Sequence, residues 1–342
     1  MDHLADDRIG NYRLESELGA AGSGLLWIAQ HLVLPRTAIV KVTHPAFAGE
    51  RAFLVQTLRE ACILEAIAHP GVPVVYESGV LRDRRPWFAC EYVSGATLED
   101  ALAGGALSIN EVAALLRDLA DLLEHVHRRG VIHRGLRPER IVLTPDRRFP
   151  LCIPDWSEAI AHDAAAEPPM VSAGGSGSYY APELAGQLAG DAHPAIDDRA
   201  DMFALGVIAH RALTGRLPRW SASGACAPVR ALRPEAPPEL TALIDALLAH
   251  DRADRPSAAE VRADLDWLFE SVPEVLGRPT VRELEPSWAR ARTQPRGLEA
   301  AAARALAELP AIPAPPAVVA EPSGPRLRRP RWTPEGPYVR SE

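Results

Sequence analysis

Residues 131–140 read Val-Ile-His-Arg-Gly-Leu-Arg-Pro-Glu-Arg, a basic stretch that follows a glycine stop. Just upstream, residues 109–129 carry apolar side chains at helical spacing, and Gly130 marks the end of that predicted helix. The same spacing recurs downstream at residues 197–213, 238–250 and 257–269. The stretch therefore lies within a mostly helical part of the chain, which we place at residues 95–271.

The chain before residue 95 has a different pattern, dominated by short β-branched and aromatic runs. It contains one amphipathic helical segment, at residues 51–68, and a glycine-rich turn at residues 19–24. Strands are predicted at residues 12–18, 25–31, 37–42, 72–76 and 86–93. The sequence thus predicts an α+β fold of two lobes, with a small β-rich N-lobe at residues 12–94 and a larger, mostly α-helical C-lobe.

Both ends of the chain differ in composition from the two lobes. Residues 1–11 form a short polar and acidic extension, whereas residues 272–342 are rich in Pro, Ala and Arg. A segment with so little apolar surface cannot offset the entropy of ordering, so we expect this tail to be largely disordered.

Charge and cysteine usage exclude several classes of protein. The net charge of −8 argues against a nucleic-acid partner. The four cysteines show no Cys-x-x-Cys spacing, which indicates a reducing, cytoplasmic setting and no zinc site. No apolar run is long enough to span a membrane.

The basic residues are almost all arginine. Of 37 Lys+Arg, Lys41 is the one lysine, and it ends a β-branched run that reads as a strand. Lysine is a compact point charge on a flexible stem and arginine is a planar fork, so the two are not interchangeable at a shaped site. The alternative is a lysine that survived by chance.

Eight elements follow one another in a fixed order. They are Leu18-Gly19-Ala20-Ala21-Gly22-Ser23-Gly24, Lys41, Glu60, His133-Arg134, Asp155-Trp156-Ser157, Ala181-Pro182-Glu183, Asp201 with Gly206, and Arg255-Pro256. In this order and spacing the chain resembles the bacterial Hanks-type Ser/Thr protein kinases over residues 12–270.

The resemblance implies a nucleotide site with ATP and Mg²⁺ as cofactors. By this resemblance Lys41 contacts the α- and β-phosphates and pairs with Glu60, and Asp155 holds one Mg²⁺. The other residues implied to bind the nucleotide are Gly19, Gly22, Gly24, Cys90, Glu91 and Val93. Cys90 reads equally well as a small buried apolar residue.

The catalytic loop departs from the family pattern, His-Arg-Asp-x-Lys-x-x-Asn. Gly135 stands at the position of the catalytic Asp, Arg137 at that of the Lys and Arg140 at that of the metal-binding Asn. Loss of a positioned general base costs about 10²- to 10⁴-fold in rate. A cation at residue 140 would also repel a second metal ion. None of the three residues that the family uses for phosphoryl transfer in this loop is therefore intact.

We therefore expect a pseudokinase, which binds ATP and acts as a regulatory or scaffold protein in bacterial signalling with little or no phosphoryl transfer. One alternative is an active Ser/Thr protein kinase, or another ATP-dependent transferase, in which Glu139 or Asp155 replaces the base. A second alternative is an interaction module that needs no nucleotide.

A protein partner is expected at the segment between Asp155 and Glu183 or at the Pro- and Arg-rich tail. In that segment Ser172, Ser176 and Ser178 are candidate phosphate acceptors, and Arg134 is a candidate to receive the phosphate. Residues 219–238 show no helical spacing, so the substrate-docking surface that the family has there is predicted to be reduced.

Overall fold

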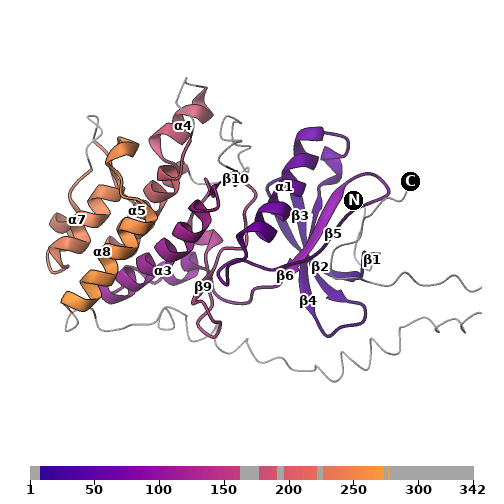
Figure 1. Ribbon diagram of the computed structural model, residues 1–342, viewed down its shortest axis with the longest axis horizontal. Helices are drawn as coiled ribbons and strands as arrows, with labels where there is room; N and C mark the ends of the chain where they lie inside the picture. The colour runs from indigo at the N-terminus through magenta and orange to yellow at the C-terminus, as the bar shows by residue number, and fades with distance from the viewer. Residues whose placement is uncertain (1–7, 162–176, 191–195, 222–225, 273–275, 277–342) are drawn as a thin grey trace, which may run out of the picture.

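The computed structural model describes residues 8–161, 177–190, 196–221, 226–272 and 276. A β-sheet with one long helix forms the N-lobe and a group of helices forms the C-lobe, and the two lie side by side (Figure 1). The predicted α+β, two-lobed fold is confirmed. The division near residue 95 agrees with the element order, and the exact bounds of the lobes stay a prediction.

The N-lobe sheet has six strands, and every neighbouring pair runs antiparallel, in the order β1-β2-β3-β4-β6-β5. Its elements are β1 (Arg8–Ile9), β2 (Tyr12–Ala21), β3 (Gly24–His31), β4 (Thr37–Thr43), the 3₁₀ turn η1 (Pro45–Phe47), α1 (Arg51–Ile67), β5 (Val75–Val80) and β6 (Pro86–Glu91).

Alternation along β4 sends side chains to opposite faces of this sheet. Val40 and Val42 pack with Trp27 and Trp87 in a small core on one face. Ile39 packs instead against the main core, to which α1 contributes apolar residues. Lys41, which lies between Val40 and Val42, therefore shares the face of Ile39 and points toward α1.

The C-lobe is built around α3, which is buried along its length and packs against α5 and α8 (Figure 1). Its elements are α2 (Leu98–Leu102), α3 (Ile109–His127), β7 (Val131–Ile132), η2 (Pro138–Arg140), β8 (Val142–Leu143), β9 (Leu151–Cys152), β10 (Ile160–Ala161), η4 (Gly177–Tyr179), α4 (Pro182–Ala189), α5 (Arg199–Thr214), α6 (Val229–Leu232), α7 (Pro238–Leu247), η5 (Arg252–Asp254) and α8 (Ala258–Ser271).

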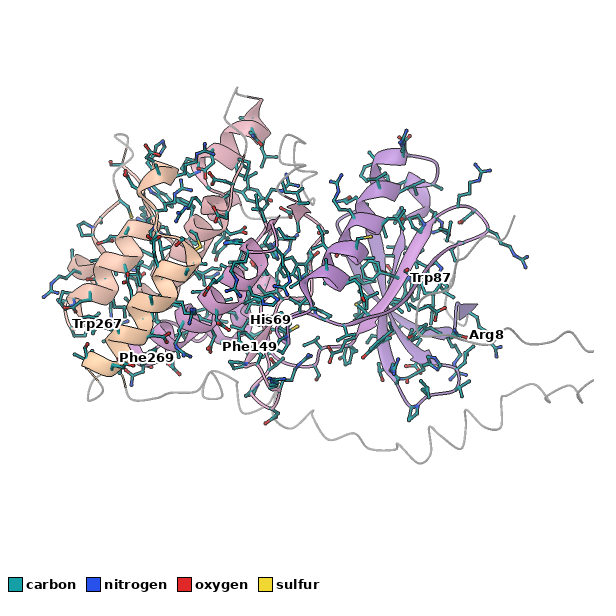
Figure 2. The ribbon with its side chains drawn as sticks, in the orientation of Figure 1. Arg8, His69, Trp87, Phe149, Trp267 and Phe269 are labelled. Atoms are coloured by element: carbon teal, nitrogen blue, oxygen red, sulfur yellow. The ribbon has the colours of Figure 1, made fainter. Side chains whose placement is uncertain are left out.

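The lobes meet at a group of rings next to the end of α1. His69 packs edge-on against Phe149, with ring centroids 4.7 Å apart, and both lie near the boundary of the lobes in Figure 2. The His125 ring of α3 lies 4.8 Å from the His69 ring, and its Nε2 is 2.7 Å from the carbonyl of Ile67. These contacts tie the last turn of α1 to the C-lobe.

The structure differs from the predictions at several local elements. The glycine-rich segment is paired strand almost to its tip, because Gly19 pairs with Leu26 and Ala21 with Gly24, so the turn is confined to residues 22–23. Two register shifts in β2 let this hairpin twist without losing its pairing. The fifth strand begins at Val75 and not at residue 72, since a turn follows His69-Pro70-Gly71.

Two further differences are short helices in the C-lobe. The structure contains α6 (Val229–Leu232), where the sequence predicted no helix, and α4 (Pro182–Ala189), which the sequence left unassigned. At the start of α8 the structure has a capping box, in which Ser257 and Glu260 bond each other's backbone N–H groups.

Candidate active site

The lysine of β4 and the glutamate of α1 form a buried ion pair. Lys41 Nζ lies 2.5 Å from Glu60 Oε2, and each side chain is 3% exposed. Burial raises the pKa of Glu60 and the ammonium of Lys41 opposes that rise. The structure thus brings together the two side chains that the sequence predicted to pair, and their burial distinguishes them from a surface ion pair.

The β2–β3 hairpin closes over this pair. A Cβ on Gly24 would lie 2.9 Å from both Cγ and Cε of Lys41, and one on Gly22 would lie 2.7 Å from the Cβ of Ser157. Only glycine allows such close approach at these two positions. Gly22 therefore rests against the Asp155-Trp156-Ser157 segment, and Gly24 covers the lysine stem.

A polar network links the hairpin to α1 and to the same segment. Ser23 Oγ is 3.4 Å from Thr57 Oγ1, and Gln56 of α1 donates to the carbonyl of Ser157 at 2.9 Å. Trp156 is fully buried, and its Nε1 donates to the carbonyl of Ile153. The bulkier Trp is thus accommodated at the position where the family has Phe, and it anchors the segment between the lobes.

Two further buried contacts join the recognised motifs of the C-lobe. Asp201 is buried and accepts backbone N–H groups from His133 and Arg134, each at 2.8 Å. The second bond stabilises Arg134 in its left-handed conformation, with φ of 60°. Arg255 and Glu183 form a buried two-bond ion pair at 2.7 and 2.9 Å.

Arg140 is the centre of the altered catalytic loop. Its Nη2 donates to Glu158 Oε1 at 2.7 Å, its Nη1 donates to the carbonyl of Gly135 at 3.0 Å, and its Nε lies 2.8 Å from Asp155 Oδ2. The Nε contact is a charge contact and not a directed hydrogen bond, since that nitrogen has no hydrogen-bond partner among the described residues.

This network fills the space that a side chain at residue 135 would need. A Cβ built on Gly135 would overlap Arg140 Nη1 and would lie 2.9 Å from both Cδ and Oε2 of Glu158. Glu158 Oε2 in turn accepts the hydroxyl of Tyr180 at 3.1 Å. A chain of polar contacts therefore runs from Asp155 through Arg140 and Glu158 to Tyr180.

Burial and charge act against each other at Asp155. Burial disfavours its charged form, but the charges of Arg140 and Lys41, with hydrogen bonds from Ser157, outweigh burial and hold the pKa of Asp155 well below its ordinary value. Arg140 is also buried, yet Asp155 and Glu158 together raise its pKa. Both groups are therefore charged at neutral pH.

The residues present do not fit a divalent metal at Asp155. Its Oδ2 faces Arg140, and its Oδ1 accepts the backbone N–H of Ser157 at 3.1 Å. A divalent ion that took Asp155 Oδ2 as a ligand would have to displace the Arg140 guanidinium, whose positive charge also opposes it. Within the described ranges, no group of three or more His, Cys, Asp and Glu side chains could hold a metal ion.

The remaining predicted residues lie at different distances from this network. Cys90 is buried in β6 opposite Ile39, and burial raises the pKa of its thiol to about 12. Glu91 and Val93 lie where the chain passes from β6 toward α2, and Glu91 Oε2 accepts from Arg147 at 3.0 Å. Glu139 is exposed on η2.

Arg137 and Arg134 are both engaged with Glu158. Arg137 Nη1 lies 3.7 Å from the carboxylate Oε1. Arg134 is buried, and its Nε donates to the carbonyl at 2.7 Å. Of the three candidate serines, Ser178 is exposed on η4, whereas Ser172 and Ser176 lie outside the described residues.

Glu158 and Tyr180 are the site residues that sequence reasoning missed. Each lies one position outside a recognised motif, Glu158 after Asp155-Trp156-Ser157 and Tyr180 before Ala181-Pro182-Glu183. An acidic residue directly after the Asp155-Trp156-Ser157 motif does not by itself indicate a functional role. Only the buried contact with Arg140 gives it a role.

Comparison with known proteins agrees with this geometry. The protein kinase domain family model matches residues 12–267, and the chain therefore belongs to the protein kinase family. Similar curated proteins are Ser/Thr-protein kinases. PknJ of Mycobacterium tuberculosis is 31% identical over 72% of this chain and 42% of its own length. Pkn1 of Myxococcus xanthus is 32% identical over 70% of this chain and 34% of its own length.

The fold comparison gives the same family. The crystal structure of the Mycobacterium tuberculosis PknI kinase domain matches with a TM-score of 0.58 and 27% identity, covering 79% of this chain and 99% of the other. The chain spans less than half the length of the curated relatives it matches. Among the described residues, no helix is both long and apolar enough to cross a membrane.

Proposed function

We propose that this chain is a pseudokinase: it binds ATP and acts as a regulatory or scaffold protein through its conformation, with little or no phosphoryl transfer. The proposal rests mainly on one observation. The place of the catalytic Asp is taken by Gly135, and the space beside it holds the guanidinium of Arg140 and the carboxylate of Glu158. An acceptor hydroxyl has no free carboxylate there to orient it.

The nucleotide-binding half of the site supports the binding part of the proposal. The buried Lys41–Glu60 pair lies beneath the glycine hairpin, the arrangement by which protein kinases place the α- and β-phosphates. The desolvation of two buried charges can cost more free energy than their mutual attraction returns, so a buried ion pair points to a use of the charges other than stability. A bound nucleotide would give Lys41 that purpose.

The hairpin offers a route from binding to conformation. Because Gly22 rests against Ser157, a triphosphate entering beneath the hairpin has to lift its tip. Ser23 and Gln56 connect the hairpin and the Ser157 segment to α1. Nucleotide binding would therefore shift the contacts of α1, a surface that a protein partner can recognise.

A thermal-shift measurement on the full chain tests binding. ATP at about 100 times its dissociation constant should stabilise the fold by about 2.7 kcal/mol, and the shift should disappear in Lys41→Met. Absence of any shift, with or without Mg²⁺, would contradict the proposal and favour a nucleotide-independent interaction module.

A second candidate function is favoured by the position of Glu158. Its carboxylate lies where the missing Asp side chain would extend, so an active Ser/Thr kinase could take its base from this residue. Against this, the Glu158 side chain is 1% exposed and its two oxygens contact Arg140 and Tyr180. Phosphoryl transfer that survives in the wild-type chain and is lost in Glu158→Gln would support this candidate.

The cellular setting is likewise a proposal. The four cysteines have no disulfide partners, which suits a reducing cytoplasm where ATP is available. The curated Ser/Thr-protein kinases that this chain resembles are more than twice as long as the matched region. We propose as partner a protein that contacts the segment between Asp155 and Glu183 or the tail at residues 272–342.

A further inference from the structure

The cations and carboxylates of the candidate site are matched without any metal. Lys41 pairs with Glu60, and Arg140 lies between Asp155 and Glu158. Arg137 supplies a third cation, 3.7 Å from Glu158. Three cations thus face three carboxylates, and no carboxylate is left without a positive partner.

This balance differs from that of the family motif. Relative to His-Arg-Asp-x-Lys-x-x-Asn, Gly135 removes one negative charge and Arg140 adds one positive charge, a combined change of two charges. This change equals the charge of one divalent ion. The carboxylate of Glu158 offsets part of it, because it pairs with the new guanidinium. Arg140 therefore supplies, beside Asp155, part of the positive charge that Mg²⁺ brings to the family's site.

Arg140 presents its guanidinium to Asp155 at the place of the metal. Its side chain is 4% exposed, and its Nε lies 2.8 Å from Asp155 Oδ2 in an ion pair that is not a directed hydrogen bond. A guanidinium donates in a fixed planar arrangement that suits phosphate oxygens, and such charge-assisted bonds are among the stronger ones. A phosphate oxygen beside Asp155 would therefore find a cation of the right shape there.

We propose that Arg140 takes the place of the divalent metal, so that this chain binds ATP free of Mg²⁺. The inference rests on the proposed nucleotide binding and adds its ionic form: the ligand is the free nucleoside triphosphate and not its magnesium complex. Mg²⁺ would compete with Arg140 for Asp155 and so gives no gain in affinity.

The experiment is calorimetric titration of the full-length chain with ATP, in EDTA and in excess MgCl₂ at matched ionic strength. The expected result is a dissociation constant in EDTA equal to or lower than that in Mg²⁺. A dissociation constant at least about tenfold lower in Mg²⁺ would overturn the inference while leaving nucleotide binding in place. No binding in either buffer would instead overturn the proposed function, and this inference with it.

Two variants locate the effect. Arg140→Asn should weaken binding in EDTA by about tenfold or more and make Mg²⁺ favourable. Arg137→Asn is the matched control: it removes the same charge from the same loop but has no contact with Asp155, so it should leave affinity independent of Mg²⁺. Equal responses of the two variants to Mg²⁺ would overturn the assignment to Arg140. The wild-type comparison needs no variant, so it decides the question even if Arg140→Asn does not fold.

Discussion

Arg140 and Asp155 form an ion pair, with Arg140 Nε 2.8 Å from Asp155 Oδ2, in the segment where protein kinases hold their metal. The contact joins the end of the catalytic loop to the Asp155-Trp156-Ser157 segment. It also fixes the guanidinium where it occludes the space beside Gly135. One arginine thus accounts for two departures from the family pattern, the missing side chain and the altered metal site.

The overlap at Gly135 predicts a non-additive pair of substitutions. Gly135→Ala should cost about 1–3 kcal/mol of stability, because its Cβ has to displace the Arg140 guanidinium from a buried, hydrogen-bonded position. In an Arg140→Ala background the same substitution should cost much less, since the overlapping atom is gone. Urea unfolding of the four proteins measures this coupling, and additive costs would show that Arg140 does not fill the space.

Glu158 predicts a graded series. Glu158→Gln removes the charge that faces Arg140 and should cost about 3 kcal/mol, in the range for breaking a buried ion pair. Tyr180→Phe removes a single hydrogen bond to the same carboxylate and should cost about 1 kcal/mol. Denaturant unfolding gives both values. Equal, near-zero costs would mean that the polar chain from Asp155 to Tyr180 contributes nothing to the fold.

Lys41→Arg tests why one lysine was kept. The Lys41 stem passes beneath Gly24 and its ammonium lies 2.5 Å from Glu60, so the broader guanidinium does not fit without moving the hairpin. ATP affinity should fall by about tenfold or more although the positive charge remains. Calorimetric titration of the folded variant measures this, and an unchanged affinity would leave the lysine as a chance survivor.

Two histidines, His133 fully buried and His69 partly buried, predict how stability depends on pH. Burial lowers the pKa of both His133 and His69 to about 4 from an ordinary value of 6.5. Their folded pKa values lie below the unfolded ones, so the unfolded chain binds more protons as the pH drops. The stabilisation is complete above about pH 6.5 and is lost toward about pH 4, on the order of 3 kcal/mol for each residue.

Urea unfolding between about pH 7 and pH 4.5 should show this histidine contribution, which acts against that of Asp118, whose pKa burial raises to about 6. His69→Asn keeps an acceptor near the N–H of Gly71, which bonds to Nδ1 in the wild-type chain, while removing the titration. Its pH slope should be shallower than that of the wild-type chain. A slope that does not change in this variant would assign the pH dependence to other groups.

Much of the fold could be predicted because it depends on patterns that are local in sequence. The long helix α3 follows from its apolar spacing and its Gly130 stop, and α8 follows from the capping box of Ser257 and Glu260. The Lys41–Glu60 pair was implied by the family resemblance, and the structure shows that strand alternation turns residue 41 toward α1. Residues 19–24 of the β2–β3 hairpin were predicted as a turn, because their three glycines do not show that the strands remain paired as far as Ala21 and Gly24.

The part that could not be predicted depends on contacts between distant residues. Arg140 was recognised as a cation at the metal position, but sequence alone could not show that it contacts Gly135, Asp155 and Glu158 together. Tyr180 is 22 residues away from Glu158, so their contact has no local signature. The fold brings Glu158 and Tyr180 into the site through contacts that their positions in the sequence do not indicate.

The most direct test of the central claim is one incubation of the full-length chain with γ-³²P-labelled ATP at a concentration that saturates binding. Filter retention reports bound nucleotide, and acid-stable label reports phosphoryl transfer to the chain or to an added protein substrate. We predict one bound nucleotide per chain and no acid-stable label above that of the Lys41→Met variant. Acid-stable label that accumulates with time in the wild-type chain, and is absent from Lys41→Met, would contradict the pseudokinase account.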